Sequence, residues 1–240
     1  DDGQHMYFVT QHSPWQYFVL PDIIREQSWA NFTPWNALFY EIGLPFFGLE
    51  PTGYYAHLLL VIGLSAAMTF FLLRLWLTPL AALIGSALFL AMPATGAIGQ
   101  MLMTGHYAYG LLFSILTFYF FTRSIQEKNF NLSLLAAACY VMACLSKEVY
   151  VPIIAILIFL PISDWKTRCS YLWPSGVVTL AYTLFRWMVL TGFGGYGIPF
   201  DANIILSSST WIHFVSSLMG SGWMWQSILS YLVIAILIAI

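Results

Sequence analysis

Charged residues are scarce in this sequence: Asp, Glu, Lys and Arg together make up 8% of its 240 residues. Soluble domains carry about 25% of these residues, so this chain has too few to cover the surface of a soluble globule. Hydrophobic residues reach 60%, and a composition this apolar excludes intrinsic disorder as well. The scarcity of charge therefore predicts an integral membrane protein whose chain crosses the bilayer several times.

The sequence also lacks the signals of several other protein classes. The net charge is −2 and no basic run occurs, which argues against nucleic acid as a partner. Three unevenly spaced cysteines, Cys139, Cys144 and Cys169, form neither a disulfide framework nor a metal-binding pattern. No nucleotide-binding loop or serine-hydrolase motif is present. The chain begins at Asp1 without a signal peptide and ends inside an apolar run, so we expect a fragment of a longer protein.

Long uncharged runs divide the chain into seven expected membrane spans. These spans cover residues 54–73, 78–97, 107–122, 131–146, 149–163, 171–190 and 223–240. Each run must be helical, because lipid offers the backbone no hydrogen-bond partner. The predicted fold is therefore an all-α polytopic transmembrane helical bundle. In it, residues 1–53 form an outside loop, 54–190 a six-span membrane core, 191–222 a second outside loop, and 223–240 a further span that the chain end truncates.

Lysine and arginine are divided unevenly between the two faces of this expected bundle. One set of loops contains Arg74, Arg123, Lys128, Lys166 and Arg168, and the other contains Arg25 and Lys147, with Arg186 near a span end. Basic loops tend to stay in the cytoplasm. We therefore expect residues 1–53, the turn near 98–106, the Lys147–Glu148 turn and residues 191–222 to face the periplasm or lumen. The host membrane would be a bacterial inner membrane or the endoplasmic reticulum.

Both outside loops are predicted to contain helices that lie in the membrane interface. The first 53 residues mix aromatic with polar side chains, and prolines divide them into short pieces. In residues 203–220, apolar side chains recur at helical spacing while serines and a histidine fall largely on the opposite side.

The candidate functional side chains gather on the outside face. Lys147 and Glu148 interrupt an apolar run, where each charge costs at least ~2.5 kcal/mol, so such residues are usually paired or functional. The alternative is a tight surface turn. His5, His57 and His106 are further candidates, although a lone histidine at such a position is more often an interfacial or helix-end residue than a ligand.

Several short motifs occur in a recognisable order. They are Asp1-Asp2, then Thr33-Pro-Trp-Asn-Ala-Leu-Phe-Tyr40, then Phe47-Gly-Leu-Glu-Pro-Thr-Gly-Tyr54 running into a span with His57, and finally Leu145-Ser-Lys-Glu148 followed by Val151-Pro152. This order resembles the GT-C superfamily of polytopic glycosyltransferases, and within it the protein O-mannosyltransferase-like and aminoarabinose-transferase-like enzymes. The resemblance extends from Asp1 to about Leu190.

The resemblance implies a polyprenyl-phosphate-linked sugar as donor and a protein, glycan or lipid acceptor on the periplasmic or lumenal side. Asp1 or Asp2 matches the acidic residue that activates the acceptor hydroxyl, although an acidic pair in a loop is often simply solvated. Lys147, with Glu148 beside it, matches the position near the lipid phosphate, whose charge an ammonium stabilises. We therefore expect the carboxylates and Lys147 to converge at one cavity. Two carboxylates could also hold Mg²⁺ or Mn²⁺, although no third ligand is evident.

Some positions depart from the family pattern and keep two other functions open. Tyr55 stands where a histidine is expected, His106 stands where many relatives carry an arginine–aspartate type pair, and no arginine follows Thr33-Pro34. One alternative is a catalytically inactive GT-C-like subunit of a larger membrane complex. The other is a transporter, which is less favoured because the mid-span positions are apolar.

Overall fold

The computed structural model describes residues 2–190, and every regular element in that part of the chain is a helix. The predicted all-α fold is therefore confirmed for this part. Asp1, the expected loop 191–222 and the expected span 223–240 lie outside the described residues.

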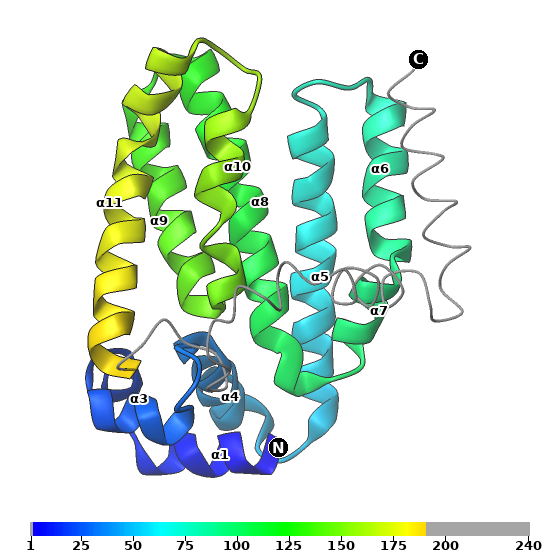
Figure 1. Ribbon diagram of the computed structural model, residues 1–240. Coiled ribbons are helices and arrows are strands. Elements are labelled where there is room, and N and C mark those ends of the chain that lie inside the picture. The colour runs from blue at the N-terminus through cyan, green and yellow to red at the C-terminus, as the bar shows by residue number, and fades with distance from the viewer. Residues whose placement is uncertain (1, 191–240) are drawn as a thin grey trace, which may run out of the picture.

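Six helices run side by side and form a bundle (Figure 1). They are α5 (Pro51–Leu73), α6 (Pro79–Ala91), α8 (Gly105–Gln126), α9 (Phe130–Ser146), α10 (Ile153–Phe159) and α11 (Trp165–Leu190). Two segments, Pro51–Leu73 and Leu102–Gln126, are long and apolar enough to cross a membrane. A third crossing results if α6 and α7 (Pro93–Gly99) form one span that is bent by 54°. By length and composition the described residues thus contain two or three candidate spans, and the expected six are not confirmed there.

Prolines and charged residues account for the smaller number of candidate membrane spans. Pro93 breaks the expected span 78–97 into α6 and α7, because proline has no backbone N–H to continue the helix. Helix α10 has only seven residues and ends before Leu160, whose neighbour Pro161 disfavours helical backbone. Helix α11 is 26 residues long, but it contains Pro174 and the charged Arg186.

Four helices cover one end of the bundle. They are α1 (Asp2–Gln11), α2 (Gln16–Val19), α3 (Pro21–Gln27) and α4 (Pro34–Phe47). Figure 1 shows them at the lower end, together with the start of α8 and the α9–α10 connection. The α5–α6, α8–α9 and α10–α11 turns lie at the opposite end (Figure 1). The segments predicted to share a face within residues 2–190 therefore lie at the same end of the bundle, and residues 2–53 are largely helical.

Proline marks the start of these elements. Pro21, Pro34, Pro51, Pro79 and Pro93 each occupy the first position of a helix. The first helical N–H has no partner within a helix, so proline loses nothing there, and its fixed φ already suits the helix.

Two hydrophobic clusters hold the end helices to the bundle. The first cluster joins α1 and α4 to α5 and α8, and its fully buried rings include Phe39, Tyr40 and Tyr54. The second cluster joins α8, α9, α10 and α11 with one another, and it also includes Ile24 and Phe32 from the N-terminal segment. The N-terminal 50 or so residues are therefore anchored to both halves of the bundle, which fixes the segment that carries the site.

A close approach near the start of α8 positions one site residue. A Cβ added at Gly110 would lie 2.0 Å from Cε2 of Tyr150, so the tyrosine ring fills the space that a side chain would need. The Tyr150 hydroxyl donates a hydrogen bond of 2.7 Å to the Tyr107 carbonyl. Glycine at this position thus allows Tyr150 to brace the first turns of α8.

Candidate functional site

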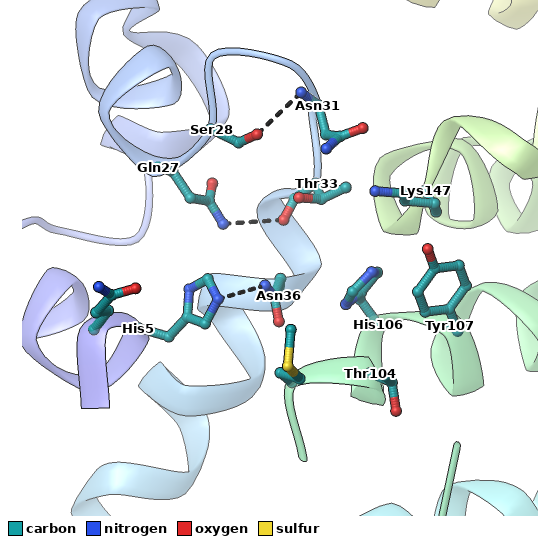
Figure 2. A pocket seen from close by; sticks show the side chains of 12 residues that line it. His5, Gln27, Ser28, Asn31, Thr33, Asn36, Thr104, His106, Tyr107 and Lys147 are labelled. Atoms are coloured by element: carbon teal, nitrogen blue, oxygen red, sulfur yellow. Dashed lines mark hydrogen bonds between the residues drawn. The ribbon is translucent and has the colours of Figure 1, made fainter. Parts of the chain in front are cut away.

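A polar cavity of about 360 Å³ lies at the end of the bundle that α1–α4 cover (Figure 2). Its wall consists of Gln4 and His5 of α1, five residues from Gln27 to Asn36, four from Met103 to Tyr107, and Lys147. The volume lies in the range of pockets that hold small molecules. Four segments that are far apart in the sequence therefore meet around one cavity.

Lys147 contributes the cation of this wall. It ends α9 in extended backbone (φ −165°, ψ 143°), and so it lies between α9 and η2 (Glu148–Tyr150). Its ammonium lies 5.8 Å from the centre of the Tyr107 ring, and within residues 2–190 it makes no hydrogen bond or ion pair. Burial lowers the pKa of Lys147, Glu148 partly opposes this, and the charge of Arg186 lowers it further. A half-buried cation of this kind gains from an anionic ligand.

Two buried polar atoms of the wall have no partner in the described part of the chain. Asn36, in the first turn of α4, donates from its amide nitrogen to Nε2 of His5 at 3.0 Å, but its Oδ1 accepts nothing. The ring of His106, in the first turn of α8, has its centre 4.4 Å from that of Tyr107 and interacts with the Met103 backbone carbonyl, while its Nδ1 has no partner of hydrogen-bond geometry within residues 2–190. Buried polar atoms are rarely left in this state, so both atoms point to a bound ligand or water.

His5 links the cavity to the predicted catalytic carboxylate. Its ring stacks on Tyr40, with the ring centres 5.5 Å apart and the planes 14° apart. The Tyr40 hydroxyl donates a hydrogen bond to Oδ1 of Asp2. Burial lowers the pKa of His5, and the carboxylate of Asp2 partly opposes this. Burial, reinforced by the hydrogen bond to Asp2, raises the pKa of Tyr40, which therefore stays a neutral donor. Asp2 itself is not part of the cavity wall.

Glu148 is not among the lining residues of the cavity, and it ties three segments together. Its Oε1 accepts a hydrogen bond of 2.6 Å from the Phe32 backbone N–H and one of 3.2 Å from Nε of Arg186. Arg186 also donates to the Ala30 carbonyl at 3.2 Å. The side chains of Arg186 and Glu148 are 10% and 20% exposed. This ion pair therefore holds α11 and the segment before α4 beside Lys147.

His57 lies in a different environment. Nε2 of His57, on α5, lies 2.6 Å from the hydroxyl of Tyr109 on α8. The His57 ring also packs against Phe39 of α4. It does not line the cavity. Within residues 2–190, no group of three His, Cys, Asp or Glu side chains could hold a metal ion.

The structure thus brings together part of the predicted site. His5, His106 and Lys147 line the same cavity. Asp2 contacts Tyr40, whose ring stacks on His5, but Asp2, Glu148 and His57 are not part of the wall.

Sequence reasoning missed the amide and hydroxyl side chains of the wall, above all Asn36 and Gln27. Asn36 belongs to the Thr33–Tyr40 motif, but no role follows from that motif for its side chain. The usable signal is one asparagine in an otherwise apolar helix, since α4 buries Asn36 together with six apolar residues. Gln27 carries no comparable signal, because its place depends on how the chain turns before α4.

Known proteins provide no relative for this chain: no family model matches it, and neither a curated protein nor a solved structure is significantly similar to it. The arguments below therefore rest on the described residues and on the motif order.

Proposed function

We propose that this chain is the membrane-embedded part of a GT-C-type glycosyltransferase. It transfers a sugar from a polyprenyl-phosphate donor to an acceptor on the periplasmic or lumenal side, and its complete fold includes the seven expected spans. The observation that carries the proposal is the half-buried Lys147 ammonium, which has no counter-ion within salt-bridge distance among the described residues and opens onto a polar cavity. The motif order provides independent support.

The cavity can bind both the phosphate and the sugar of such a donor. The ammonium of Lys147 would hold the phosphate, while the amides and hydroxyls of the wall face the sugar. The lipid chain would extend along the apolar flank of the bundle, where α5 leaves Leu59, Leu60 and Leu64 exposed. A phosphate near Lys147 is also the leaving group, so the same cation stabilises the charge that develops on its oxygen.

The transfer step needs one base. The acceptor oxygen attacks the anomeric carbon, its proton passes to a carboxylate of Asp1 or Asp2, and the bond between the anomeric carbon and the phosphate oxygen breaks. The electron pair of that bond remains on the phosphate, beside Lys147. Asp2 belongs to α1, the helix that also supplies His5, and it accepts a hydrogen bond from Tyr40 of α4. The nearness of Asp2 to a residue of the wall supports it as a candidate base.

Transfer of radiolabelled sugar from undecaprenyl- or dolichyl-phosphate donors by the purified full-length protein tests this function. Replacing a general base typically costs ~10²–10⁴ in rate, so either Asp1→Asn or Asp2→Asn should reduce transfer by that factor. Lys147→Ala should weaken donor binding, whereas Lys166→Ala, an exposed lysine at the start of α11, should not. Unchanged transfer in both aspartate variants would refute the assignment of the base.

One observation favours a second candidate, a catalytically inactive subunit that only binds the lipid donor. Among the described residues, no carboxylate lines the cavity, and Asp2 is already engaged by Tyr40. In that case wild-type protein would bind the donor through Lys147 but would not consume it. Binding without turnover in the assay above separates the two functions.

A further inference from the structure

The described wall of the cavity carries a single permanent charge, the ammonium of Lys147. The remaining polar side chains are amides, hydroxyls and imidazoles, and none of the twelve lining residues is acidic. Burial lowers the pKa of His5, which therefore stays neutral at physiological pH. Lys147 can bind an anion, and the rest of this wall is suited to neutral hydrogen-bonding groups.

The wall also has unused hydrogen-bonding capacity of a particular kind. Asn36 and His106 are 7% and 8% exposed, and each has a buried atom, Oδ1 and Nδ1 respectively, without a partner among the described residues. One is an acceptor, and the other accepts or donates according to its tautomer. A sugar hydroxyl both donates and accepts, so neighbouring hydroxyls on one ring can satisfy both atoms.

Internal hydrogen bonds hold this wall in place before any ligand arrives (Figure 2). Gln27 donates from Nε2 to the Thr33 carbonyl at 3.1 Å, and the Asn31 backbone N–H donates to Oγ of Ser28 at 3.1 Å. The Asn36 amide is fixed by its contact with His5. A ligand therefore meets groups that are already oriented, which lowers the entropic cost of binding.

We propose that this cavity selects a donor whose sugar is an uncharged, polyhydroxylated ring, and that it disfavours amino sugars and uronic acids. This inference rests on the proposed function and names the sugar class that the donor carries. The ammonium of an amino sugar would meet no carboxylate among the twelve lining residues, because the Asp2 carboxylate is held by Tyr40 outside the wall, and it would be repelled by Lys147. The carboxylate of a uronic acid would compete with the phosphate for the same cation.

Binding of three lipids to the full-length protein tests the inference: polyprenyl phosphate, its hexosyl ester and its aminopentosyl ester. Wild type should bind the hexosyl lipid about tenfold more tightly than either of the others. His106→Phe removes the unpartnered nitrogen, so it should reduce hexosyl affinity about tenfold and change the affinity for unglycosylated phosphate by less than twofold.

A gain of affinity provides the sharper comparison. Gln4→Glu places a carboxylate at the cavity, and the Gln4 side chain makes no hydrogen bond in the described part of the chain that would be lost. The variant should raise affinity for the aminopentosyl lipid about tenfold. Gln11→Glu, on the same helix but outside the wall, is the matched control and should change nothing.

The outcomes separate this inference from the proposed function. If wild type binds all three lipids equally, or prefers the aminopentosyl lipid, the inference is wrong while the lipid-phosphate site stands. If wild type binds none of the three, the proposed function fails and the inference fails with it.

Discussion

Replacing Glu148 by alanine is expected to destabilise the protein and to loosen the cavity at the same time. The substitution leaves the Phe32 N–H without its acceptor and Arg186 without its carboxylate, although the hydrogen bond from Arg186 to Ala30 remains. Because Lys147 precedes Glu148 directly, the same change should also loosen the position of Lys147 in the cavity wall.

The magnitude follows from the burial of the pair. Breaking a buried ion pair by removing one partner costs about 3–5 kcal/mol. The Glu148 side chain is 20% exposed, so water can compensate in part, and we expect the lower end, about 3 kcal/mol. For a chain of this length that corresponds to a fall in Tm of about 6–12 °C. Glu148→Gln keeps an acceptor for the Phe32 N–H and loses only the charge, so its fall should be about half as large.

Thermal unfolding of the purified protein in detergent measures these values. Glu127→Ala is the matched control, because Glu127 pairs with Arg123 on the surface of α8 and that pair is well exposed to solvent. Its removal should leave Tm almost unchanged. In a parallel binding measurement, Glu148→Ala should weaken donor binding more than Glu148→Gln does. Equal Tm values for Glu148→Ala and Glu127→Ala would show that the buried pair does not hold these segments together.

Three further predictions address the cation, the packing and the topology. Burial lowers the pKa of Lys147, so affinity for a lipid phosphodiester should fall as pH rises through a value below 10.5, whereas Lys147→Arg should keep its affinity; equal pH profiles would contradict this. Gly110→Ala should cost about 1–3 kcal/mol in chemical unfolding because its Cβ meets a ring, while Gly63→Ala, with open space, should not, and equal effects would refute the packing argument. In a variant without native cysteines, Gly3→Cys and Ser163→Cys should react with an impermeant thiol reagent from opposite sides of the membrane, and labelling from one side would reject the topology.

The sequence was sufficient to predict the helical class and the grouping of the loops. Successive helices in a bundle reverse direction, so counting helices already assigns the N-terminal segment, residues 98–106 and residues 147–148 to one end. Figure 1 shows residues 2–53 and these two connections there. The number of spans was less predictable. A count of uncharged residues ignores bends, and neither the break at Pro93 nor the early end of α10 changes that count.

The candidate site was predictable only where a side chain is unusual in its local sequence. Lys147 stands out because it interrupts an apolar run, and this signal led to a residue of the cavity wall. The ion pair between Glu148 and Arg186 could not be foreseen, since the two residues are far apart in the sequence and belong to different elements. Asn36 meets His5 only because α1 packs on α4, which no local pattern encodes.

The position of the cavity follows from how the N-terminal segment is packed. Its early part joins the first hydrophobic cluster through Phe8 and Val9, its middle joins the second through Ile24 and Phe32, and α4 returns to the first through Phe39. Between these two anchors, Asn36 and His106 present polar atoms from the first turns of α4 and α8. These polar atoms favour a ligand or water as neighbour over apolar side chains, because burying a polar atom without a hydrogen-bond partner is unfavourable. The cavity therefore lies where α1, the segment before α4, the start of α8 and the α9–α10 connection meet, and Lys147 is the only cation among its described lining residues.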